Sequence, residues 1–147
     1  MADRVNVNLT IRKEDQIIFE ALCDDFNGKF EGETFPNEVA TIEYSFHEVN
    51  DAELEIEQLL QEKIIPYDKT WEQGRGYNAG TKYHRIDSNG NSIIKLIDKN
   101  MEGMVTLEDV EKAVEQACIH KFIKEKRNAF HIISWKDQGS ILSARNQ

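Results

Sequence analysis

The sequence has little of what disulfide frameworks and membrane spans require. Its 147 residues include only two cysteines, Cys23 and Cys118, and both fall where we expect largely buried helix positions. No apolar run approaches membrane length, and residues 1–4 carry no apolar signal core. We therefore expect a reduced, cytoplasmic protein that makes no membrane contact.

The signatures of common enzyme classes are also missing. The sequence has no Walker loop and no Gly-x-Ser-x-Gly elbow. Its four histidines are scattered, and no pair of histidines or cysteines has the spacing of a zinc site. The sequence does not decide whether the chain is an enzyme, but it favours a non-enzymatic protein with no catalytic residues and no required cofactor.

The composition is that of one soluble domain with an acidic balance. The chain is 39% hydrophobic and 31% charged, and its formal net charge is −9. This charge argues against direct nucleic-acid binding, because neutralising phosphates needs a basic surface. It is compatible with a basic protein partner, and it also fits an acidic surface that serves solubility alone.

Hydrophobic periodicity predicts the order strand, helix, strand, helix, strand, hairpin, helix. The predicted elements are a strand over 5–11, a helix over 14–26, a strand over 38–49, a helix from the cap Asn50 to about Glu62, a strand over 64–71, a hairpin formed by 81–87 and 92–97, and a helix from the cap Thr106 to about Arg127–Asn128. This order indicates an α+β sandwich, with a mainly antiparallel sheet, helices on one face and a ferredoxin-like variant of that topology.

Three segments are not assigned a regular element by their pattern. Residues 29–37 are interpreted as a loop, and 129–135 fit either a strand or a continuing helix. Residues 138–147 are interpreted as a loose C-terminal tail. We therefore expect a single domain over residues 1–137, followed by this tail.

Acidic and basic residues are divided at residue 63. Residues 14–62 hold fifteen acidic residues against one lysine, a net charge of −14, whereas 63–100 hold seven basic residues against four acidic ones, a net charge of +3. We expect the acidic residues of the first two helices to contact a basic partner, although a solvated helix face also accounts for them. The residues concerned are Glu20, Asp24, Asp25, Glu53, Glu55, Glu57 and Glu62.

The basic segment over 69–85 also carries aromatic residues and glycines. Its glycine-rich loop over 74–80 is followed by a predicted strand, so it does not meet the context of the dinucleotide fingerprint, which opens a helix. Loop amides, basic groups and aromatic rings together suit an anionic or nucleotide-like ligand, although a solvent-facing strand has the same pattern. The candidate ligand-binding residues are Lys69, Trp71, Arg75, Tyr77, Lys82, Tyr83, His84 and Arg85.

Residues 98–109 resemble the twelve-residue calcium loop of EF-hand proteins. The resemblance implies metal ligands at Asp98, Asn100, Glu102, the Met104 carbonyl and Asp109. Asp109 stands where the family has a longer, bidentate Glu, so the resemblance implies weak calcium binding or a preference for magnesium. The same residues also fit a strand, a glycine turn and a capped helix that hold no metal.

Three functions follow from these patterns. The leading hypothesis is a non-enzymatic acidic interaction protein, of the adaptor or small-inhibitor type, that binds a basic protein surface. The first alternative is a binder of a small anionic or nucleotide-like ligand over 69–85. The second is a calcium- or magnesium-responsive module over 98–109. The sequence does not identify the partner or the oligomeric state.

Overall fold

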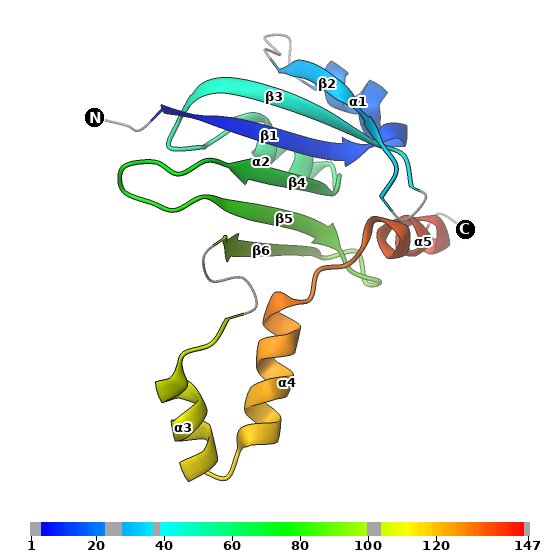
Figure 1. Ribbon diagram of the computed structural model, residues 1–147. Helices are drawn as coiled ribbons and strands as arrows, with labels where there is room; N and C mark the ends of the chain where they lie inside the picture. The colour runs from blue at the N-terminus through cyan, green and yellow to red at the C-terminus, as the bar shows by residue number, and fades with distance from the viewer. Residues whose placement is uncertain (1–3, 23–27, 37–38, 100–103, 146–147) are drawn as a thin grey trace.

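The structure is a computed structural model that describes residues 4–22, 28–36, 39–99 and 104–145 (Figure 1). Its strands are β1 (Arg4–Arg12), β2 (Lys29–Thr34), β3 (Thr41–Asn50), β4 (Tyr67–Trp71), β5 (Gly80–Ile86) and β6 (Ser92–Asp98). Its α-helices are α1 (Gln16–Ala21), α2 (Ile56–Glu62), α3 (Leu107–Glu115), α4 (Ile119–Phe130) and α5 (Trp135–Arg145), and a 3-10 turn (Lys13–Asp15) precedes α1.

The strands form one antiparallel sheet in the order β2-β3-β1-β4-β5-β6. The first part of the chain, from β1 through α1, β2, β3 and α2 to β4, has the order of a ferredoxin-like fold, with β1 between β3 and β4. The β5–β6 hairpin extends this sheet by two strands at the β4 edge. The structure therefore confirms the α+β class and the ferredoxin-like variant predicted from the sequence.

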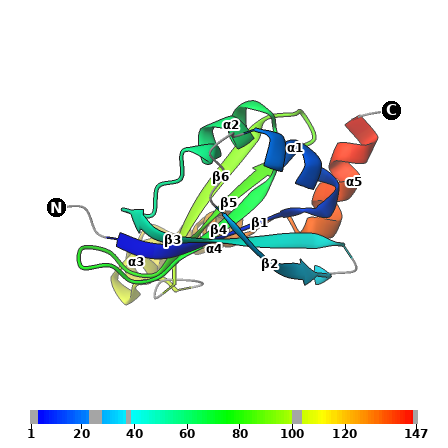
Figure 2. The same ribbon diagram turned by 90° about the horizontal axis from the view of Figure 1, so that it is seen from above.

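The core lies between the sheet and the two helices that cover one of its faces, α1 and α2 (Figure 2). The strict alternation in β1 places Val7, Leu9 and Ile11 on this face, and all three are fully buried. Phe19 of α1 and Leu60 of α2 close the core from the helix side. This covered face is called the helix-bearing face below.

The strand register brings two lysines onto the helix-bearing face. Leu9 of β1 pairs with Lys69 of β4, and Lys69 in turn pairs with Lys82 of β5. Because directly paired residues lie on the same face of a sheet, both lysines face α2 together with core residues. Lys82 pairs with Leu96 of the edge strand β6.

Four segments differ from the sequence-based expectations. Helix α2 begins at Ile56 rather than after a cap at Asn50, which is the last residue of β3. Residues 29–34, interpreted as a loop, form the edge strand β2. The last long helix is divided at residues 116–118 into α3 and α4. Residues 138–145, expected to be a loose tail, belong to α5, where the Gln138 side chain bonds to both the backbone nitrogen and the oxygen of Ile86.

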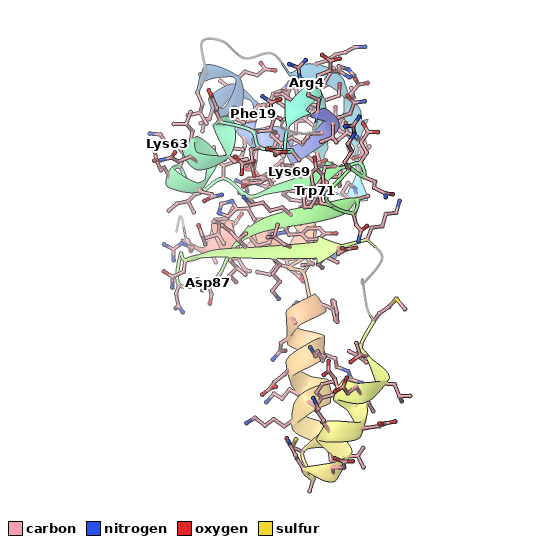
Figure 3. All side chains as sticks on the ribbon, turned by 90° about the vertical axis from the view of Figure 1, so that its left-hand side faces the viewer. Arg4, Phe19, Lys63, Lys69, Trp71 and Asp87 are labelled. Atoms are coloured by element: carbon pink, nitrogen blue, oxygen red, sulfur yellow. The ribbon has the colours of Figure 1, made fainter. Side chains whose placement is uncertain are left out.

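Helices α3 and α4 form a hairpin that projects away from the sheet (Figures 1 and 3). Lys95 of β6 holds the base of this hairpin, because its Nζ donates to the carbonyls of Asn128 and His131. Among the helices that the structure describes, none is both long enough and apolar enough to cross a membrane.

Candidate functional site

A cleft of about 670 Å³ lies on the helix-bearing face, between the segment that leads into α2 and the strands β4, β5 and β6. We call it the Glu57 cleft. Its lining residues are Asp51, Ala52, Glu53, Leu54, Glu57, Gln58, Gln61, Lys69, Trp71, Tyr77, Asn78, Lys82, Leu96, Ile97 and Asp98. Figure 3 shows Lys69 and Trp71 within the sheet body, well away from the projecting hairpin.

The Glu57 carboxylate is the centre of a buried hydrogen-bond network. Lys69 Nζ donates to Glu57 Oε2 over 2.9 Å, and Lys82 Nζ donates to Oε1 over 3.0 Å. The Tyr67 hydroxyl and the Leu54 backbone amide also donate to this carboxylate, each over 3.0 Å. The charges of both lysines are therefore directed to Glu57 rather than to the open cleft.

This network keeps Glu57 ionised. Burial alone would raise the pKa of the Glu57 carboxyl, but the hydrogen bond and charge of Lys69, the Leu54 amide and the hydrogen bond from Lys82 outweigh it. The resulting pKa lies below its ordinary value. Burial also raises the pKa of the Tyr67 hydroxyl, so this group stays a neutral donor to Glu57.

The backbone at the rim of the cleft is strained. Asp51 and Ala52 have φ angles of 50° and 58°, in the left-handed region that side-chain-bearing residues rarely adopt. The Ala52 carbonyl accepts a 2.7 Å hydrogen bond from Lys69 Nζ. Lys69 thus holds the strained turn and the Glu57 carboxylate together, which fixes the position of the rim.

Aromatic side chains form the opposite wall. The Trp71 indole donates to the Asn78 carbonyl over 3.0 Å, and the Asn78 amide donates to Asp98 over 3.0 Å. A Cβ atom at Gly80 would lie 2.7 Å from the Trp71 ring, so only glycine lets the indole lie across β5. Tyr77 lines the same cleft.

The formal charge of the cleft is negative. Two lysines face four acidic side chains (Asp51, Glu53, Glu57 and Asp98), which gives a formal charge of −2. Both lysines already bond to Glu57, whereas Asp51 and Glu53 are exposed at the rim. This distribution favours a cationic group over an anionic one.

The structure brings four of the eight predicted ligand-binding residues together in this cleft: Lys69, Trp71, Tyr77 and Lys82. Arg75 lies in the neighbouring loop and does not line it. Lys69, Trp71 and Lys82 share a face because residues at every second position of a strand do, whereas Arg75 and Tyr77 lie in the loop between β4 and β5, outside this alternation.

The other three predicted ligand-binding residues lie elsewhere. Tyr83 and Arg85 point to the opposite face of β5, where the Arg85 guanidinium lies 4.2 Å from the Trp135 ring centre and Nη1 lies 2.6 Å from Asp68 Oδ1. His84 shares the face of the cleft but is fully buried outside it.

Both ring nitrogens of His84 are used within the protein. Nδ1 lies 2.8 Å from the Ile65 carbonyl, and Nε2 lies 2.9 Å from Ser92 Oγ. Burial lowers the pKa of this imidazole, so the ring is neutral; Nδ1–H then donates to Ile65, and Nε2 accepts from Ser92. His84 therefore has a structural position, which differs from the ligand-binding role expected for it.

Some of the acidic residues predicted to form a partner-binding surface are exposed, and one of them is buried. Glu53, Glu55 and Glu62 are exposed around α2, and Glu20 is exposed on α1, where it accepts from the Tyr44 hydroxyl. Burial and the bond to Glu20 raise the pKa of Tyr44 to about 12. Asp24 and Asp25 lie outside the described residues.

Among the described residues of this acidic set, Glu57 is the one that the structure places differently. It was expected on an exposed helix face, but it is buried between two lysines. The helical pattern could not show this, because the two lysines come from strands that follow it in the sequence. Sequence reasoning also missed Asp51, Gln61 and Asn78 as lining residues, since nothing in a polar loop or helix residue signals which cleft it faces.

The proposed calcium loop is described only at its ends. Asp98 closes β6 and accepts from Asn78, and the Asp109 amide donates to Thr106 Oγ1 at the start of α3. Met104 is exposed, while Asn100 and Glu102 lie outside the described residues. Among the residues that are described, no group of three or more His, Cys, Asp or Glu side chains is arranged to hold a metal ion. Metal binding here stays a prediction.

Comparisons with known proteins give no relative: no family model, no curated protein and no solved structure matches this chain.

Proposed function

We propose that this chain is a non-enzymatic binding protein that engages a basic surface of a protein partner at the Glu57 cleft, where it accepts a Lys or Arg side chain. The observation that carries the proposal is the charge of the cleft, which has four acidic residues against two lysines that are both bonded to Glu57.

A cationic side chain fits this arrangement better than an anion does. An anion would have to draw Lys69 or Lys82 away from Glu57 and leave a buried carboxylate without its partners, which is costly. A cation instead approaches the exposed rim acids Asp51 and Glu53, and the rings of Trp71 and Tyr77 line the same space.

The surroundings of the cleft suit a protein partner more than a free small cation. Leu96 and Ile94 on the edge strand β6 are 69% and 43% exposed, and their pairing with Lys82 and His84 places them on the helix-bearing face. An apolar patch beside charged residues is typical of a protein interface. The exposed acids of α1 and α2 extend the negative potential on this face and favour encounter with a basic surface.

The test measures binding of octa-arginine, with octa-glutamate and AMP as probes of opposite charge, by the NMR shifts of the Trp71 indole and the Asn78 amide. We expect octa-arginine to shift both signals, with an affinity that falls as salt is added. The double substitution Asp51→Asn with Glu53→Gln should abolish the shifts.

A matched control separates the cleft from net charge. Glu48 and Asp137 are exposed residues outside the cleft, so Glu48→Gln with Asp137→Asn gives the same charge change elsewhere. This control variant should bind octa-arginine as the unmodified protein does. If both double variants bind octa-arginine more weakly and to the same extent, the binding reflects general charge attraction, which contradicts the proposal. Binding of AMP in place of octa-arginine would favour the anionic or nucleotide-like ligand.

A further inference from the structure

The α3–α4 hairpin has almost no core of its own. Ala113 is the one buried residue of α3, and α4 has no buried residue over its described length. Both helices carry large apolar side chains, and several of these are exposed: Leu107 is 72%, Val114 60% and Ile123 40% exposed. Helices gain most of their stability by packing an apolar face, so this hairpin lacks the packing that such helices require.

An apolar groove of about 770 Å³ runs along the hairpin. Val110 of α3 lines it, together with Ile119, Phe122, Ile123 and Phe130 of α4. The hairpin projects from the sheet, and no described element of the same chain covers the groove (Figures 1 and 3).

The two helices carry equal and opposite charge. Helix α3 has four acidic residues and one lysine, a formal charge of −3, whereas α4 has four basic residues and one glutamate, a formal charge of +3. The ion pairs of the described hairpin lie within single helices, Lys112 with Glu108 in α3 and Lys121 with Glu125 in α4. Glu111, Glu115, Lys124 and Arg127 are exposed, whereas Lys126 is half-buried beside the Phe122 ring.

We propose that this hairpin is a dimerisation element, and that the occupant of its groove is the same hairpin of a second copy of this chain. Two hairpins related by a twofold axis form a four-helix bundle in which each α3 lies against the α4 of the other copy. The apolar grooves then face each other, and each helix meets a partner helix of opposite charge.

The charge pattern selects a second copy over other occupants. An anionic surface, such as a lipid membrane or a nucleic acid, attracts α4 but repels α3, whereas a second hairpin complements both helices at once. The projection of the hairpin also suits this pairing. The twelve residues of α4 span about 18 Å, so the acidic sheet bodies lie beyond a Debye length of about 8 Å at physiological salt.

The first test measures the mass of the full chain by sedimentation equilibrium over a range of concentrations. We expect a reversible dimer, and we expect Ile123→Glu to raise its dissociation constant roughly 100-fold. Circular dichroism checks that the variant keeps its sheet. A protein that is monomeric up to its solubility limit overturns the proposal, as does a dimer that Ile123→Glu leaves intact.

The second test uses charge reversal and identifies which helices meet. One variant carries Glu111→Lys with Glu115→Lys in α3, and the other carries Lys124→Glu with Arg127→Glu in α4. Each variant alone opposes like charges across the interface and should be monomeric, whereas an equimolar mixture restores both attractive pairs and should form a heterodimer. A mixture that stays monomeric contradicts the pairing of α3 with α4. If the unmodified chain is monomeric and binds phosphatidylserine vesicles or duplex DNA through α4, the groove has a different occupant and the proposal fails.

Discussion

At the scale of single residues, Glu57 gives the chain's charge pattern a structural meaning. The acidic first part of the sequence supplies this carboxylate, and the basic middle part supplies Lys69 and Lys82, which bond to it. Arg85 is likewise buried, with Asp68 beside it. Three basic residues of the middle segment therefore pair internally, and the expected basic surface is smaller than the sequence indicates.

Glu57→Gln should destabilise the fold. The substitution leaves two lysines in or near the core without their counter-charge, and breaking a buried ion pair in this way costs about 3 kcal/mol. Urea denaturation followed by circular dichroism measures the loss. Glu62→Gln is the control, because Glu62 lies on the same helix but is exposed, and it should change the free energy of unfolding by less than about 0.5 kcal/mol. Equal losses in the two variants would contradict the role of the network.

The contribution of Glu57 should depend on pH in a definite direction. Its folded-state pKa lies below the ordinary value of 4.5, so its ionised form stabilises the fold. This stabilisation is complete above the unfolded-state pKa and is lost as the pH falls through the folded-state pKa. The difference in unfolding free energy between the unmodified protein and Glu57→Gln should therefore be largest near neutral pH and narrow below about pH 4.5. A constant difference down to about pH 3 would contradict this assignment.

At the scale of the elements, the end of α3 departs from a common sequence rule. The Cys118 amide donates to the Ala113 carbonyl and the Ala117 amide donates to the Val114 carbonyl, which is the bonding of a Schellman motif. This motif needs a left-handed residue, and Ala117 has a φ of 54° where glycine is usual.

Ala117→Gly should consequently stabilise the hairpin. Glycine adopts the left-handed region without the penalty that a Cβ incurs, so we expect a gain of about 1 kcal/mol. Hydrogen exchange of the α3 amides measures it locally. Ala129→Gly in α4 is the matched control. The same change at an ordinary helical position should destabilise its own helix and accelerate hydrogen exchange of the α4 amides. Faster exchange in Ala117→Gly would show that the turn is not strained.

The division of the long helix shows where sequence reasoning reaches its limit. Its periodic apolar residues continue through residue 117, and no glycine or proline marks the turn, so a single helix was expected.

Strand β2 was missed for a related reason. It lies at the sheet edge with both faces largely exposed, so its formation depends on pairing with β3 rather than on an alternating pattern of its own. Helix α5 docks through the polar residue Gln138, which a hydrophobic pattern does not mark.

The strongly periodic elements were predictable because burial and periodicity coincide in them. Strand β1 alternates strictly, and the β5–β6 hairpin flanks a turn of Asn and Gly residues, so both follow from the sequence. Three of the eight candidate ligand-binding residues, Lys69, Trp71 and Lys82, share the cleft for the same reason, since they lie at alternating or paired positions of two predicted strands. Their bonds to Glu57 were not predictable, because these depend on the packing of α2 across the sheet.

At the scale of the whole molecule, the excess of acidic over basic side chains lies mostly on the surface, because Lys69, Lys82 and Arg85 form ion pairs with acidic residues inside the protein. A net charge of −9 on one domain produces self-repulsion that opposes the folded state. The α3–α4 hairpin differs from the rest, because its two helices carry opposite charges that a second copy complements. Salt should therefore act in opposite directions on the fold and on the dimer.

We expect the midpoint of thermal unfolding to rise by a few degrees between about 0.01 M and about 0.1 M NaCl, as the Debye length falls from about 30 Å to about 10 Å and screens the repulsion. The dimer dissociation constant should increase over the same range, because the α3–α4 attraction between copies is screened as well.

Differential scanning calorimetry and sedimentation equilibrium on the same samples separate the two effects, with Ile123→Glu as the reference for the fold without the dimer. In this variant the rise in midpoint should be at least as large as in the unmodified protein, because no dimer is lost on adding salt. A midpoint that falls with salt in Ile123→Glu would mean that attractive surface ion pairs outweigh the net repulsion, and the acidic surface would then be balanced locally rather than available to a basic partner.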